Sequence, residues 1–273
     1  PIEQPNEKIR VGNIKYVEEF EINQPRAYIT KIVPYSVIDD FAAITMAAQI
    51  LFEKRNSPVQ YKLVEEEKLV NWIYGYFTEG GYFPVPMIQL VFETKNTSNL
   101  DGVIKRIDEI IAEVAKKGVT QQQINDVISR EKAQKLLKTP SLDTDAQNIG
   151  WNMIVYGIPD IFDILMKQYE KLTPHMINEA IKKYFVPENR VVFYGVPQGD
   201  KSLIKLTDKQ STNNYIENPG NNLSLKQYYS NKLNNQVDEE STKKVIVSEP
   251  EKIVINKDII LLYKQNTDDP VIQ

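Results

Sequence analysis

The sequence predicts an α+β fold, a two-layer sandwich in which a mostly antiparallel sheet is covered on one face by several helices. Residues 24–197 carry the order strand, helix, two strands, several helices and strand, which is typical of a sheet with helices on one side. Hydrophobic residues make up 41% and charged residues 26% of the 273 positions, close to the averages of globular domains. The composition therefore excludes wholesale disorder.

The first half of this body supplies strands and one helix. Residues 26–33 are rich in β-branched and aromatic types and predict a strand. Residues 37–53 carry apolar positions at helical spacing and predict a helix. Residues 69–77 and 86–94 are apolar runs separated by a short, glycine-containing connection, so we expect them to pair as a hairpin.

Two long helices are predicted next. Residues 100–114 carry a nearly ideal apolar stripe, and Ser98 or Asn99 is expected to cap this helix. Thr120 and Gln123 form a capping box, because the hydroxyl and the amide of such a pair satisfy free backbone groups of a helix start reciprocally. A second long helix is therefore expected to begin there.

Shorter elements complete the body. Residues 143–156 and 159–170 predict two helices separated by a glycine. Thr173 is a suitable cap and Pro174 a favoured first-turn residue for a further helix. Residues 190–196 close the body as a strand.

The composition changes after this body, and it predicts three parts. We expect residues 1–200 to form an α+β domain and residues 201–248 to form a polar linker. Eight asparagines fall among residues 213–235, which favours a linker over a packed domain. Residues 249–273 are expected to be the truncated start of a following domain.

Two elements are expected within this C-terminal part. One helix is predicted near residues 225–233. Residues 252–256 and 259–263 are apolar runs around a polar turn and predict a hairpin. A lone hairpin is only marginally stable, so we expect more chain to follow it. The sequence starts at Pro1, and we interpret it as a piece of a longer protein.

The residue inventory excludes several kinds of chemistry. The chain has one histidine and no cysteine, which excludes a histidine-rich metal site, a zinc-thiolate site, a thiol nucleophile and a disulfide. Its net charge of −4 argues against a nucleic-acid surface, which needs a cationic footprint. No membrane span is expected, because residues 158–166, the most apolar candidate, contain Asp160 and Asp163.

The remaining candidate residues favour structural roles. His175 lies near a predicted helix start without a second histidine one turn away, so we interpret it as an exposed first-turn residue. The acidic run 65–67 is interpreted as a solvated face, because successive helical side chains diverge. Four aspartates lack the glycine-punctuated spacing of a calcium loop and are interpreted as helix caps: Asp143, Asp145, Asp160 and Asp163.

Two further segments resemble binding motifs but lack the basic residues that such motifs need. Trp72, Tyr74 and Tyr76 share one face of a predicted strand, as in a base-stacking sheet, but the basic residues of such a platform are missing. We therefore expect these rings to serve core or partner packing. Gly80 and Gly81 are the only adjacent glycines, and no Lys-Ser/Thr pair follows to form a phosphate loop.

The helical half contains a further ordered set of motifs, which are Gly118-Val119-Thr120, Ala133, Leu136-Leu137, Ser141, Gly150, Gly157, Leu172-Thr173-Pro174, Ala180, Lys183-Tyr184-Phe185, residues 187–192 and Pro197. This series resembles the second half of a pitrilysin-type metallopeptidase domain, the family of insulin-degrading enzyme and the mitochondrial processing peptidases. The resemblance covers about residues 26–197. It implies a clamshell built from homologous α+β domains, of which one carries the inverted zinc motif His-x-x-Glu-His.

This sequence departs from the family at its functional positions. It has no His-x-x-Glu-His, so the resemblance implies no catalytic residue and no metal ligand here. Family members hold substrate with an Arg and a Tyr in a segment Arg-x-x-x-Gly-Leu-x-Tyr. Aligning residues 57–71 with that segment puts Val64 at the Arg position and Asn71 at the Tyr position. Within the family, this loss points to the second, non-catalytic domain of the catalytic half.

The resemblance therefore implies a structural, chamber-forming domain of a zinc-dependent metalloendopeptidase that hydrolyses peptides, inactive by itself. Zinc is expected in the catalytic domain of the full-length protein. The expected partners are the catalytic and C-terminal-half domains of the same polypeptide, and a peptide substrate. The alternative is a catalytically inactive homologue that acts as a protein-interaction or assembly subunit. The sequence does not decide the compartment, although family precedent favours the periplasm or cell envelope over the cytoplasm.

Overall fold

The computed structural model describes residues 9–10, 12–79, 85–137, 141–204, 215–216, 225–234, 251–256 and 259–263. The strands are β1 (Ile9–Arg10), β2 (Ile14–Phe20), β3 (Arg26–Ile32), β4 (Val70–Thr78), β5 (Met87–Thr94), β6 (Val191–Pro197), β7 (Tyr215–Ile216), β8 (Glu251–Asn256) and β9 (Ile259–Tyr263). The α-helices are α1 (Phe41–Ala48), α2 (Pro58–Gln60), α3 (Leu100–Lys117), α4 (Gln121–Leu137), α5 (Leu142–Val155), α6 (Phe162–Tyr169), α7 (Pro174–Tyr184) and α8 (Leu225–Asn234). Tighter or wider turns form η1 (Tyr35–Asp40), η2 (Gln49–Glu53), η3 (Tyr61–Glu66), η4 (Thr97–Asn99) and η5 (Lys201–Leu203).

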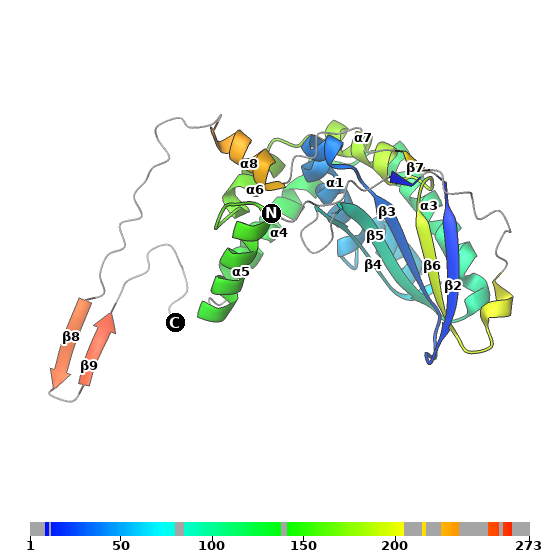
Figure 1. Cartoon of the computed structure of the whole chain (residues 1–273), viewed down its shortest axis with the longest axis horizontal. Coiled ribbons are helices and arrows are strands. Elements are labelled where there is room, and N and C mark those ends of the chain that lie inside the picture. Colours follow the sequence, from blue (N-terminus) through cyan, green and yellow to red (C-terminus); the bar gives the residue numbers. More distant parts are fainter. Residues whose placement is uncertain are drawn as a thin grey trace.

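The body is a five-stranded sheet in the order β2-β6-β3-β5-β4 (Figure 1). The pairs β6–β3, β3–β5 and β5–β4 are antiparallel, and β2 pairs parallel with β6. The predicted α+β class with a mostly antiparallel sheet is confirmed, as is the hairpin of β4 and β5. Strand β2 was not predicted. It is an edge strand with charged residues at three of its seven positions, so its sequence gives little apolar signal.

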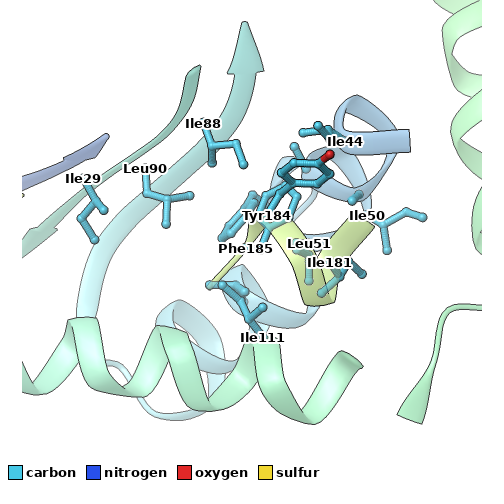
Figure 2. Packing of buried hydrophobic residues seen from close by; sticks show 14 of the residues in the cluster. Ile29, Ile44, Ile50, Leu51, Ile88, Leu90, Ile111, Ile181, Tyr184 and Phe185 are labelled. Atoms are coloured by element: carbon cyan, nitrogen blue, oxygen red, sulfur yellow. The ribbon is translucent and has the colours of Figure 1, made fainter. Parts of the chain in front are cut away.

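One face of the sheet is covered by helices, and the core lies between the two layers. The buried residues of β5 alternate with half-buried ones, as the two-residue period of a strand requires. Figure 2 shows Ile29, Ile88 and Leu90 on the side of the sheet that faces the end of α7, at Tyr184 and Phe185. Helix α3 closes this layer with a fully buried apolar stripe: Leu100, Val103, Ile104, Ile107, Ile110 and Ile111.

Helix ends test the capping predictions. Thr120 and Gln123 form the predicted reciprocal pair, and the Thr173 hydroxyl accepts a hydrogen bond from the Met176 amide at 3.3 Å. The prediction that Ser98 or Asn99 caps α3 is wrong. The turn η4 leads directly into α3, and Asn99 at the cap position has helical dihedral angles and makes no side-chain capping bond.

The predicted helix at residues 37–53 is broken into three pieces. The turn η1 precedes α1, and the wider π-type turn η2 follows it. The charged segment after residue 57 is also helical, in α2 and η3, which the sequence did not predict. Leu63 anchors η3 because its side chain is completely buried. A six-residue turn with one buried anchor is too short to show a helical period.

The C-terminal part contains the predicted helix as α8, and the predicted hairpin as the two-stranded β8–β9 sheet. Helix α8 packs against the body through Leu225 and Tyr229, each 3% exposed. Most of the predicted linker 201–248 lies outside the described residues, and the division into domains at residues 200 and 248 stays a prediction. No helix in the described ranges is both long and apolar enough to cross a lipid bilayer.

Candidate functional site

The sheet face opposite the helices carries a row of aromatic side chains. Cross-strand register places Tyr16, Phe193, Tyr28, Val91 and Tyr74 next to one another across all five strands. We call this set the aromatic row. Its tyrosines are exposed by 40 to 60%. Exposed aromatic side chains gathered on one face are typical of an interaction site.

Further rings extend the aromatic row on both sides. Phe20 lies edge-on to Phe193, with ring centroids 6.1 Å apart. Trp72 and Tyr74 are 5.3 Å apart at a tilted angle, and Tyr76 continues along β4 with 47% exposure. Core or partner packing was predicted for Trp72, Tyr74 and Tyr76. The exposure of Tyr74 and Tyr76 excludes core packing for these two side chains. The helical layer covers the other side of β4, so these rings are left for contact with another molecule or domain.

A polar cluster borders the aromatic row where β3, β4 and β5 meet. Arg26 Nε donates to Glu93 Oε2 at 2.8 Å, and Asn71 Nδ2 donates to Glu93 Oε1 at 3.1 Å. The Arg26 guanidinium also lies 5.7 Å from the centre of the Trp72 ring. Partial burial raises the pKa of the Glu93 carboxyl, but the hydrogen bonds from Arg26 and Asn71 outweigh it, so the net pKa is below the ordinary value. The charges of Arg26 and Glu93 cancel, and Asn71 adds an uncharged amide. These groups can form hydrogen bonds with polar groups of a ligand.

The two positions aligned with the family's substrate-holding residues differ in environment. Asn71 belongs to this polar cluster, at the bulge between Val70 and Trp72. Val64 lies in η3, where its half-buried side chain packs against the core. An apolar side chain packed in that way cannot donate hydrogen bonds to a substrate. The equivalence of these positions with the family residues stays a prediction.

The single histidine is exposed in the first turn of α7. It borders a hollow of about 630 Å³ that is also lined by Asp39, Asp40 and Glu179. Within the part of the chain that the structure describes, no group of three His, Cys, Asp or Glu side chains could hold a metal ion. The residues present therefore do not fit a zinc centre, and no chemical step can be assigned to this hollow.

The acidic candidates have other partners. Glu67 accepts hydrogen bonds from Arg106 Nε at 3.0 Å and Nη2 at 2.8 Å, so the interpretation of the run 65–67 as a merely solvated face is wrong at Glu67. Asp160 Oδ1 accepts from the amide of Phe162, the first residue of α6, at 2.9 Å, but the cap position is Ile161, and Asp163 lies inside the first turn. The prediction that these two aspartates cap the helix is therefore wrong in its positions. Ser141, and neither nearby aspartate, caps α5. The Gly80-Gly81 turn lies outside the described residues.

One polar residue that the sequence analysis did not select is Glu79, directly after β4. Its Oε2 atom is buried and accepts no hydrogen bond from the described residues. Burial raises the pKa of this carboxyl to about 7, against smaller lowering effects of hydrogen bonds from Thr45 and Tyr156. Glu79 is flanked in sequence by aromatic and glycine residues, so only tertiary structure shows its burial.

The described residues thus form an α+β domain whose sheet has one helix-covered face and one open aromatic face. Residues 1–131 match the family described as the peptidase M16 inactive domain. This match confirms the resemblance to a non-catalytic pitrilysin-type domain for these residues.

Several solved structures share the fold. The peptidase M16 inactive domain from Pseudomonas fluorescens is 21% identical with a TM-score of 0.55, over 68% of this chain and 44% of that one. A protease from Helicobacter pylori is 14% identical with a TM-score of 0.59, over 69% and 45% of the two chains. The periplasmic protease PqqL from Escherichia coli is 14% identical with a TM-score of 0.53, over 68% and 21%. This chain thus spans less than half the length of each. No curated protein sequence matches it.

Proposed function

We propose that this chain is a structural, chamber-forming domain of a zinc-dependent metalloendopeptidase that hydrolyses peptides. The observation that carries the proposal is the aromatic row on the uncovered face of the sheet. Tyrosine rings offer apolar area together with a hydroxyl group, and they lose little conformational entropy on contact. Such a wall contacts many peptide sequences without selecting one.

The layer arrangement supports the same role. The hydrophobic core lies between the sheet and the helices, on the face opposite the aromatic row. Contacts made by the open face therefore leave the core unchanged. The polar cluster of Arg26, Asn71 and Glu93 adds hydrogen-bonding groups at one end of the row. We propose the catalytic and C-terminal-half domains of the same polypeptide as partners, with zinc bound in the catalytic domain. We propose the periplasm or cell envelope as the compartment, because one protease with this fold is described as periplasmic.

The proposal is tested in the full-length protein that contains this chain. Replacing Tyr28 and Tyr74 together by Ser removes one ring from the middle and one from the β4 end of the aromatic row without touching the core. We expect kcat/KM to fall for peptides long enough to reach the wall and to stay unchanged for short peptides cleaved in the same assay. The matched control replaces Tyr61, a tyrosine of η3 that is 50% exposed and lies outside the row.

Equal losses for long and short peptides would contradict a wall that contacts substrate. A full-length protein without His-x-x-Glu-His, whose partner chain is lost when Tyr28 and Tyr74 are replaced, would instead show the assembly-subunit alternative.

A further inference from the structure

Helix α8 is fastened to the body by specific contacts. Leu225 and Tyr229 are buried, and the Tyr229 ring meets the Tyr156 ring edge-on with centroids 5.5 Å apart. The Tyr228 hydroxyl donates to Asp39 Oδ1 at 2.8 Å. Two apolar anchors and one hydrogen bond therefore hold a ten-residue helix that would be marginal alone.

The body provides a fitted seat for this helix at the end of α5. Gly157 has a φ of 72°, and a Cβ atom at this position would come within 2.9 Å of Lys226 Cγ. A larger residue would be strained in its backbone and would displace the Lys226 side chain from this position.

Glu79 lies in the same interface. Burial and then the Glu79 carboxylate raise the pKa of the Tyr229 hydroxyl above its ordinary value, and the same two causes act on Tyr169 in α6. Hydrogen bonds from Thr45 and Tyr156 reach the Glu79 carboxyl, while its Oε2 atom stays unpaired. An ionised carboxylate with an unpaired buried oxygen is costly, whereas a protonated one is tolerated.

Few other charges act on this interface. Burial raises the pKa of the tyrosines of α6 and α8 that interact with Glu79, so they stay neutral between pH 5 and 8: Tyr169, Tyr228 and Tyr229. Tyr156, at the end of α5, is a hydrogen-bond partner of the Glu79 carboxyl. The α4 residue Glu131 acts on Tyr169 and bonds to Gln49, and Asp39 and Lys232 bond to Tyr228 at the exposed side. Lys232 is the only cation among these residues, and it bonds to Tyr228 rather than to Glu79.

We propose that α8 is a proton-linked strap, which docks over Glu79 when that carboxyl is protonated and loosens when it is ionised. Helix α8 is the last described helix before β8, so its docking holds that part of the chain to the body, and ionisation of Glu79 weakens this hold. This inference does not rest on the proposed function.

Amide hydrogen exchange of α8 in the 273-residue chain tests the proposal. If release exposes Glu79 fully, the protection of α8, corrected for intrinsic rates, falls by up to about 70-fold from pH 5 to pH 8, because the carboxyl pKa moves from about 7 to its ordinary value. Glu79→Gln keeps a neutral group of the same shape and should leave protection nearly constant. The control Glu170→Gln removes an exposed carboxylate that pairs with Lys132 and should keep the full pH dependence.

Equal pH dependence in the wild type and in Glu79→Gln, or unprotected α8 amides at pH 5, would overturn the proposal.

A second measurement covers the case in which Glu79→Gln fails to fold. Linkage requires that weakening α8 lowers the pKa of Glu79. Replacing both buried anchors, Leu225 and Tyr229, by Ser releases α8, and carboxyl NMR titration should then show a lower pKa for Glu79 than in the wild type. An unchanged pKa would contradict the strap.

Discussion

Gly75 is the position at which a single methyl group should damage the fold most clearly. It lies in the middle of β4, and an added Cβ would lie 2.4 Å from Phe52 Cγ and 2.6 Å from Leu90 Cδ2. Carbon atoms in contact normally stay about 3.5 to 4.0 Å apart. Phe52 is 1% and Leu90 5% exposed, so neither side chain has free space to enter.

The expected cost follows from these distances. Overpacking a core costs about 1 to 3 kcal/mol, and the overlap of more than 1 Å here puts Gly75→Ala at the upper end. Removing a strand glycine returns about 0.5 kcal/mol of backbone entropy. We expect a net loss of about 2 to 3 kcal/mol, measured by urea unfolding followed by circular dichroism.

The control is Gly102→Ala in α3, where an added Cβ meets no atom within 4 Å. That change should stabilise the chain by about 0.5 to 1 kcal/mol, since alanine is the better helix former. If Gly75→Ala and Gly102→Ala shift the unfolding midpoint equally, or in the same direction, the packing of β4 against η2 and β5 is wrong.

Three further results are expected. Asp108 accepts two hydrogen bonds of 2.7 Å from Arg190, and the side chains of Arg190 and Asp108 are only 12% and 22% exposed. Asp108→Asn should lower the free energy of unfolding in urea by about 2 to 3 kcal/mol. A loss under about 0.5 kcal/mol would mean that the pair is exposed to solvent. The pKa of Glu79 is raised to about 7 in the folded chain, so its contribution to the free energy of unfolding is fully present below the ordinary pKa and is lost as pH rises through 7. The expected loss is about 2.5 kcal/mol between pH 5 and pH 8. Glu79→Gln should abolish this part of the pH dependence. Tyr74→Ser should change the free energy of unfolding by less than about 0.5 kcal/mol, since that ring is 60% exposed, and a larger loss would mean that another part of this chain covers it.

The sequence predicts those parts of the fold that depend on neighbouring residues. The apolar stripe of α3 and the alternation in β4 and β5 identify elements and the faces that belong together. The caps at Thr120 and Thr173 are likewise local. Parallel pairing of β2 with β6 joins residues more than 170 positions apart, and no local period signals it.

The candidate site depends even more on distant pairing. The rings of Trp72, Tyr74 and Tyr76 share a face by strand period alone, but the period does not say which face the helices cover. Only the register brings Tyr16 and Tyr28 beside Phe193 and completes the aromatic row. The burial of Glu79 arises from helices that follow it by more than 70 residues, so its sequence neighbours give no indication.

The zinc content of the purified 273-residue chain tests the central claim most directly. The account predicts well below one zinc per chain after equilibration with excess zinc and removal of the free metal, together with no chelator-sensitive peptide hydrolysis. It rests on a sequence with one histidine and no cysteine, and on described residues that offer no metal-ligand cluster. Stoichiometric zinc with chelator-sensitive hydrolysis by this chain alone would contradict a non-catalytic domain.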